Sequence, residues 1–164
     1  MLKKTFLLFL FLFTTACGYE AIHWKKNKVD YDFAISKLTF IGDRSVNLKI
    51  KEKLNNYTLV KKNKNFALAI SSQAKKEVFA KNVAGNPTSF KSIIIIDVKV
   101  LMENKLKNNL RIVESFNYNN DTNKFNLNKY ESEIINNLTE TASDRLIFKL
   151  SNIQWYWNHL NSIN

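Results

Sequence analysis

Residues 90–101, Phe-Lys-Ser-Ile-Ile-Ile-Ile-Asp-Val-Lys-Val-Leu, indicate the fold class of this 164-residue chain. In an extended strand, the apolar residues at every second position from Ile94 to Val100 share one face, and Ile93 and Ile95 share the other. Four consecutive isoleucines are typical of a central strand that is buried at its middle on both faces. The stretch therefore predicts the central strand of a sheet.

Three more strands are predicted around this one. Residues 32–41 carry apolar side chains on both faces of an extended strand, and residues 65–80 follow period two. Residues 110–118 predict the fourth strand. Residues 82–87, Asn-Val-Ala-Gly-Asn-Pro, are the clearest turn in the chain, and residues 104–109 predict a second turn. We expect four strands in one sheet.

Two helices complete the pattern. Apolar residues recur at helical spacing over residues 46–57, after Ser45 as a candidate N-cap, and again for more than six turns over residues 127–150. Asn128 and Glu131 have the spacing of a capping box at the start of the second helix. The order β-α-β-β-β-α predicts an α+β two-layer sandwich, with a four-stranded mixed sheet and both helices packed on one face.

The N-terminus has the pattern of an export signal. Lys3 and Lys4 precede eight consecutive Phe and Leu residues, 6–13, and small residues follow. Eight residues extend about 12 Å as a helix, which is too short to span a bilayer. A buried N-terminal helix would suit the two lysines poorly. We therefore predict a signal peptide at residues 1–16.

The end of this segment resembles a bacterial lipoprotein signal, in which small residues precede a cysteine that becomes lipidated. Thr15, Ala16 and Cys17 match, whereas Thr14 stands where Leu is usual. The resemblance implies a Cys17 with several acyl chains, enough for stable anchoring in a membrane. Because Gly18 rather than Asp follows, it implies the periplasmic face of the outer membrane. An unmodified buried cysteine is the alternative.

The remaining chain divides into three predicted parts. Residues 17–31 would be the lipidated cysteine and a polar tether, residues 32–154 the α+β domain, and residues 155–164 an aromatic C-terminal tail. The tail begins Trp-Tyr-Trp, and such side chains favour positions that are apolar at one end and wet at the other. They could dock on a barrel wall or a membrane, or simply cover the open end of the sheet.

The composition limits the possible functions. A formal charge of +11 would attract an anionic membrane or lipid headgroup. However, only three of the 25 basic residues are arginine and 23 residues are asparagine, so biased coding could account for much of that charge. A single cysteine excludes an internal disulfide, and three glycines exclude glycine-rich phosphate loops.

No pattern predicts catalysis. The two histidines, His23 and His159, lie far apart in the sequence, and the chain contains no HExxH, CxxC or GxSxG motif. We therefore expect neither an enzyme nor a metal site or cofactor. Nucleic-acid binding is not expected either, because no recognised motif accompanies the basic charge and the chain carries an export signal.

With these elements in place, the chain resembles the LPS-assembly lipoprotein family, LptE. The resemblance covers nearly all of the chain after the signal peptide and is carried by Cys17-Gly18-Tyr19, the turn and strand over residues 81–100, Ser115-Phe116-Asn117-Tyr118-Asn119, Asn123-Lys124-Phe125 and Tyr130-Glu131. It implies a protein that plugs a large outer-membrane LPS-transport β-barrel (LptD-like), helps that barrel to assemble, and binds lipopolysaccharide.

The resemblance also implies a ligand site. Lys81, near the turn after the second strand, and Lys129, at the start of the last helix, match the family's LPS-binding positions. Lysine side chains can hold lipid A phosphates by charge-assisted hydrogen bonds. Solvated surface lysines are the alternative for both. For the whole chain, the alternative is a free-standing envelope lipoprotein that binds another protein or the cell wall.

Overall fold

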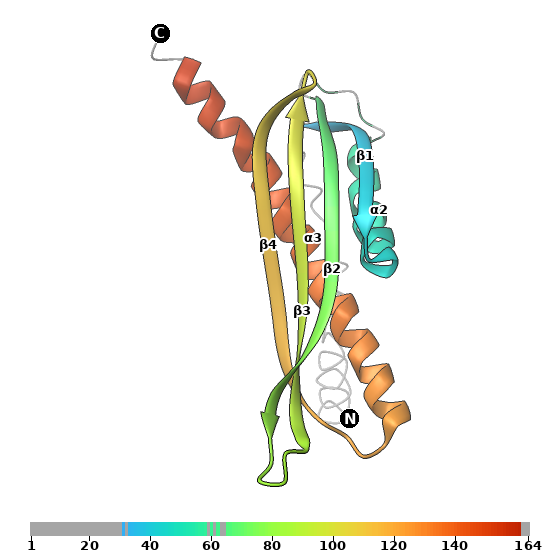
Figure 1. Cartoon of the computed structure of the whole chain (residues 1–164). Helices are drawn as coiled ribbons and strands as arrows, with labels where there is room; N and C mark the ends of the chain where they lie inside the picture. The colour runs from blue at the N-terminus through green and yellow to red at the C-terminus, as the bar shows by residue number, and fades with distance from the viewer. Residues whose placement is uncertain (1–30, 32, 59, 61, 63–64, 162–164) are drawn as a thin grey trace, which may run out of the picture. The chain divides into compact units, whose positions relative to one another are not determined.

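The computed structural model describes residues 31, 33–58, 60, 62 and 65–161, with the backbone alone for 154–161. The predicted signal peptide, residues 1–16, and Cys17 lie outside the described residues. The predicted tether lies outside them too, except for residue 31. The elements follow the predicted order (Figure 1): β1 (Ala34–Gly42), α2 (Arg44–Thr58), β2 (Asn65–Lys81), β3 (Pro87–Met102), β4 (Lys105–Asn119) and α3 (Lys124–Asn161). The predicted α+β fold with a four-stranded mixed sheet is confirmed.

The sheet has the strand order β1-β2-β3-β4. β1 and β2 are parallel and are joined through α2, as a parallel pair requires a crossover. β2, β3 and β4 are antiparallel neighbours; Ile70 of β2 pairs with Val98 of β3, which pairs with Leu110 of β4. Two hairpins therefore build the long part of the sheet.

Both helices pack on the same face of the sheet (Figure 1). The residues of that face and of the two helices that meet it form the main core, with side chains at most 5% exposed: Phe33, Ile35, Val46, Ile50, Leu54, Phe66, Leu68, Ile70, Ile94, Ile96, Val98, Val100, Ile112, Ala142, Leu146, Ile147 and Leu150. The predicted helical and strand periodicities therefore identify the core face of each element.

The opposite face of the sheet is not covered by any described helix, and here one prediction was wrong. Ile94 and Ile96 are fully buried, but Ile93 and Ile95 are only partly buried. Both of these isoleucines face neighbouring strands' side chains, which shield them in part. We call this surface the open face. Burial of β3 is thus one-sided, and the run of isoleucines reflects a half-covered strand.

Both helices begin earlier than predicted. Asp43, not Ser45, caps α2, because its Oδ1 accepts the backbone N–H of Val46 at 3.0 Å. Asn123, not Asn128, caps α3, because its Oδ1 accepts the N–H groups of Phe125 and Asn126 at 3.1 and 3.2 Å. Several Asn, Asp and Ser residues stand near each start, and spacing alone did not choose among them.

Two further boundaries differ from the predictions. The turn after β3 is only Glu103-Asn104, both with positive φ (52° and 60°), and β4 already begins at Lys105. Positive φ at both central residues suits a two-residue hairpin turn. At the other end of the domain, α3 continues to Asn161, so the first residues of the predicted tail are helical. Helical spacing over residues 127–150 would place Tyr130 on the apolar side of α3, but its side chain is 45% exposed.

Gly42 connects β1 to α2 through a close backbone contact. It has a φ of +101°, and a Cβ built there would lie 2.0 Å from the backbone oxygen of Ser72. The next residue, Asp43, donates its N–H to that same oxygen at 3.1 Å. Only glycine fits this junction without strain, because L side chains rarely adopt such a φ and the space is filled.

Candidate functional site

The β2–β3 hairpin extends beyond both helices at one end of the domain (Figure 1). Its turn is built as the sequence predicts: Gly85, at a φ of +83°, donates its N–H to the Asn82 backbone oxygen at 2.9 Å, and Asn86 donates to the Asn82 side chain at 2.9 Å. The ladder is irregular between Val78 and Lys81, which bends the strand there. The hairpin is therefore an ordered arm.

The arm carries apolar and cationic side chains together. Val78, Phe79 and Val83 are exposed, although such residues are usually buried. Lysines stand at positions 75, 76, 81 and 91 of the same arm. We call residues 75–91 and the first two turns of α3, residues 124–131, the hairpin end. Its chemistry suits an amphiphile that offers both acyl chains and anionic groups.

Lys76 joins the two parts of the hairpin end. Its ammonium group pairs with the Glu131 carboxylate of α3 and lies 4.1 Å from the centroid of the Phe90 ring. Tyr118 of β4 donates its hydroxyl to the same Glu131 oxygen at 2.9 Å. Burial of Tyr118, together with the nearby Glu131 carboxylate, raises the pKa of the phenol to about 12. These contacts fix the start of α3 against the sheet.

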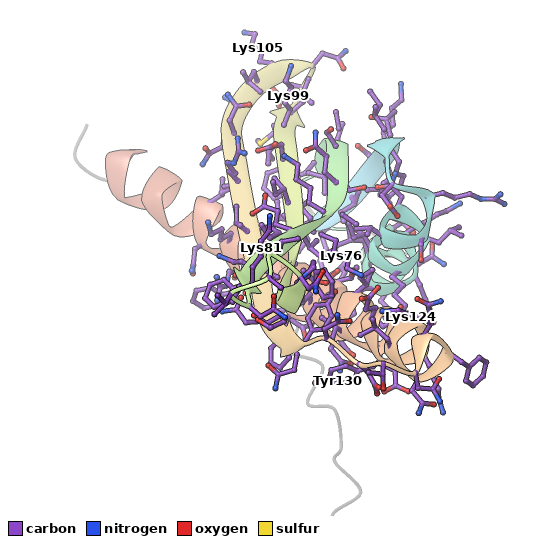
Figure 2. All side chains as sticks on the ribbon, turned by 60° about the horizontal axis from the view of Figure 1, so that its bottom comes forward. Lys76, Lys81, Lys99, Lys105, Lys124 and Tyr130 are labelled. Carbon is purple, nitrogen blue, oxygen red and sulfur yellow. The ribbon has the colours of Figure 1, made fainter. Side chains whose placement is uncertain are left out.

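The structure places the predicted lysines apart from this network. Lys81 is exposed near the end of β2 and makes no hydrogen bond or ion pair with another described residue (Figure 2). Lys129 is also exposed, and it stands two residues, or about 200° of helical rotation, from the buried Leu127. Lys129 therefore lies on the outer side of α3, whereas Glu131 faces the sheet. Cys17 lies outside the described residues.

Sequence reasoning missed the network of Lys76, Phe90, Tyr118 and Glu131. Its members come from four separate elements, so no local sequence motif could predict it. In the register of the sheet, Tyr118 pairs with Phe90 and Phe90 with Val78 on the helix-covered face, an alignment between strands that alternation within each strand does not determine.

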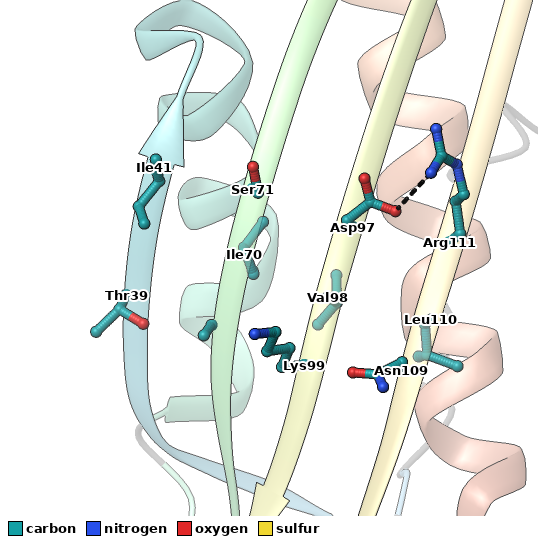
Figure 3. Close-up of a pocket in the computed structure, with 11 residues that line it drawn as sticks. Thr39, Ile41, Ile70, Ser71, Asp97, Val98, Lys99, Asn109, Leu110 and Arg111 are labelled. Atoms are coloured by element: carbon teal, nitrogen blue, oxygen red, sulfur yellow. Dashed lines mark ion pairs between the residues drawn. The ribbon is translucent and has the colours of Figure 1, made fainter. Parts of the chain in front are cut away.

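The open face contains a shallow depression of about 430 Å³ (Figure 3). Small side chains of β2, Ala69 and Ser71, form its floor. Asp97 and Arg111 stand on one side, 3.7 Å apart, as an exposed ion pair. Such a pair contributes little to stability, about 0–1 kcal/mol. The depression can accept a projecting side chain from another molecule.

The described residues contain no group of three or more His, Cys, Asp or Glu side chains that could hold a metal ion. Among them, too, no helix is both long enough and apolar enough to cross a membrane.

Arg111 and Arg145 are each in an ion pair, the latter with Glu114 at 2.8 Å. The hairpin end itself contains lysines and no arginine, so an anion there would meet lysines.

No protein-family model and no curated protein matches this sequence. Solved structures do match. Rare lipoprotein B from Shewanella oneidensis superposes with a TM-score of 0.61 at 15% identity, over 75% of this chain and 99% of that chain. The minor lipoprotein from Acinetobacter baumannii gives 0.58 at 12% identity, over 76% and 93%. Lipoprotein B from Nitrosomonas europaea gives 0.54 at 9% identity, over 76% and 88%. The chain has the fold of these bacterial lipoproteins.

Proposed function

We propose that this chain is an outer-membrane lipoprotein of the LPS-assembly kind, anchored by Cys17 on the periplasmic face. In this role it plugs and helps to assemble an LPS-transport β-barrel and assists the insertion of lipopolysaccharide into the outer leaflet. The observation that carries the proposal is the fold, which the chain shares with rare lipoprotein B over nearly the whole of that structure. The lipoprotein signal ending at Cys17 supports it from an independent part of the sequence.

The dimensions of the sheet are suited to a plug. β3 has 16 residues, which extend about 50 Å as a strand. The apolar band of an outer-membrane barrel is about 25 Å tall. A rigid domain of this length can therefore run through a wide lumen and project at one end.

The open face offers a surface for the barrel wall. It mixes polar side chains with exposed Ile41 and Val113, and its depression has small residues at the bottom. The lumen of a wide barrel is polar, so a mixed surface matches it better than a wholly apolar one would. No described element of this chain covers that face.

The hairpin end is the proposed contact for lipopolysaccharide. Lys81 and Lys129 would bind phosphate groups, and the exposed Val78, Phe79 and Val83 would contact acyl chains. Burial of each acyl methylene is worth about 0.8 kcal/mol, so even partial contact with the chains would add to the charge interactions. The proposal assigns no catalytic group and no cofactor to the chain.

Co-purification tests the proposed function. The tagged protein is extracted from its native membranes in mild detergent, and the proteins recovered in near-equal amount are identified. One large outer-membrane β-barrel is the expected partner. Recovery of the protein alone, or with a soluble protein, would contradict the plug and favour a free-standing envelope lipoprotein.

A further inference from the structure

A second concave surface lies where the chain leaves β4 and enters α3. It has a volume of about 650 Å³, which is within the range of small-molecule sites. Residues 116–122 form one wall, and Asn126, Leu127 and Tyr130 of α3 form the other. We call it the β4–α3 cleft. The side chains of Phe116 and Tyr118 lie on the helix-covered face of β4 and those of Asn117 and Asn119 on its open face, so the cleft lies at the edge of the sheet. The proposed phosphate-binding lysines are not part of its lining.

Hydrogen bonds of both backbone and side chains hold the β4–α3 cleft in shape. Asn120 donates its N–H to the Thr88 oxygen at 2.8 Å and its side-chain amide to the Pro87 oxygen at 2.9 Å. The Asp121 carboxylate accepts the N–H of Asn123 at 2.8 Å. These bonds fix the connection between β4 and α3. A ligand would therefore meet a wall that is already ordered, which lowers the entropic cost of binding.

Several polar side chains of the cleft remain available. Thr122 and Asn126 are exposed, and so are Asn117 and Asn119 on the open-face side of the sheet edge. None of these four side chains forms a hydrogen bond with another described residue. Each amide offers both a donor and an acceptor, and the threonine hydroxyl offers both as well. β4 is also an edge strand, so part of its backbone is open to further hydrogen bonds. Such mixed groups match vicinal hydroxyls, which also donate and accept.

Two aromatic rings stand among these amides. Phe116 is 47% exposed and Tyr130 is 45% exposed, and both line the cleft. Tyr130 is held edge-on against Tyr118, with ring centroids 6.1 Å apart and an interplanar angle of 84°. An exposed, fixed ring offers an apolar platform for the C–H face of a sugar ring.

The charge of the lining argues against an anionic ligand. Asp121 is the one charged residue among those that line the cleft, and no lysine or arginine is among them. Lys124 stands nearby, but its ammonium group lies 3.4 Å from both the Asn120 side-chain oxygen and the Asp121 backbone oxygen. The lining therefore offers no cation to a phosphate, whereas a neutral polyol would contact amides, hydroxyls and aromatic rings.

We propose that the β4–α3 cleft binds a neutral oligosaccharide, with its rings against Phe116 and Tyr130 and its hydroxyls on Thr122 and the Asn126 amide. This binding activity goes beyond the proposed function, which assigns barrel contact to the open face and contacts with phosphates and acyl chains to the hairpin end, and assigns no sugar contact. The two proposals are therefore tested separately. A barrel partner without sugar binding would support the proposed function and contradict the cleft. Sugar binding without a barrel partner would support the cleft and contradict the plug.

Side-chain amide NMR of the full-length protein in a sugar-free zwitterionic detergent tests this inference. The probe is maltotriose, a neutral hexose oligosaccharide without phosphate or carboxylate groups, and inorganic phosphate is the charged comparison. We expect the oligosaccharide to shift the Asn126 side-chain amide resonances saturably and phosphate to leave them unchanged. No saturable shift, or an equal shift with phosphate, would overturn the proposal.

Paired variants locate the binding. Phe116→Ser and Asn126→Ala should each weaken oligosaccharide binding about five- to tenfold, the factor expected for one lost contact. Phe148→Ser and Asn137→Ala are matched controls, because both residues are exposed on α3 and lie outside the cleft and outside the hairpin end. Equal affinities for cleft and control variants would contradict the site. Asn126 is exposed, so its variant keeps the test decisive if Phe116→Ser fails to fold.

Discussion

Tyr118 at the end of β4 donates its hydroxyl to Glu131 of α3 at 2.9 Å, and Lys76 of β2 pairs with the same carboxylate oxygen. This one acceptor therefore joins two strands of the sheet to the start of the long helix. The junction holds the arm against α3. Among the described residues, packing of Phe90 against Tyr118, Leu127 and Ile134 is a further contact between them.

Tyr118→Phe tests the contribution of this junction to stability. The variant keeps the ring contacts but removes the hydroxyl, so the free energy of unfolding should fall by about 1–2 kcal/mol. Urea denaturation measures the change. Tyr130→Phe is the control, because Tyr130 is nearly half exposed and its hydroxyl bonds to no described residue; its stability should change by less than about 0.5 kcal/mol. Equal effects of the two variants would contradict the junction.

The pH dependence of the same group has a definite sign. The pKa of Tyr118 is raised to about 12 in the folded protein, above the ordinary value near 10. Its contribution to stability should therefore be complete below about pH 10 and should be lost as the pH rises towards 12. The difference in 295 nm absorbance between wild type and Tyr118→Phe should titrate near pH 12. A difference that titrates near pH 10 would show that the phenol is not held by burial and Glu131.

Gly42 and Gly85 form a natural pair of tests. Gly42→Ala should lower the free energy of unfolding by about 3 kcal/mol or more, because it combines a strained φ with a clash against Ser72. Gly85→Ala has a similar φ but open space around it, so it should cost about 1–2 kcal/mol. Thermal unfolding of both variants separates strain from clash, and similar losses would refute the close approach at Gly42.

Lysine variants test the hairpin end. Lys81→Glu with Lys129→Glu should weaken lipopolysaccharide binding about tenfold or more, because charge-assisted bonds to phosphate become repulsive. Lys99→Glu with Lys105→Glu has the same change in charge at the far end of the domain (Figure 2) and should bind as wild type does. Binding of labelled lipopolysaccharide measures both. An unchanged affinity in the folded Lys81/Lys129 variant would remove those residues from the site.

The sequence predicted elements more accurately than their ends. Period-two and helical spacing located every strand and both helices, because burial against the sheet imposes those spacings. The N-caps at Asp43 and Asn123 were missed, since neighbouring Ser and Asn residues are equally good caps by type. β4 begins at Lys105 although four of its first five residues are polar, because an exposed strand end needs no apolar alternation.

The candidate sites were less predictable, for a physical reason. The resemblance supplied Lys81 and Lys129, but only the packed structure shows that Lys129 lies on the outer side of α3. The network around Glu131 and the β4–α3 cleft both combine residues from separate elements, which periodicity cannot align. The six asparagines between residues 117 and 128 were the available signal for the cleft, but the high asparagine content of the whole chain concealed it.

Photo-cross-linking from several faces of the domain tests the central claim most directly. A photoreactive residue is placed in turn at Lys99 on the open face, Leu48 on α2 and Phe148 on α3, three exposed positions. A plug is surrounded by its barrel, so all three positions should cross-link to the same outer-membrane β-barrel in native membranes. Cross-links from one face alone, or to no barrel at all, would contradict the account.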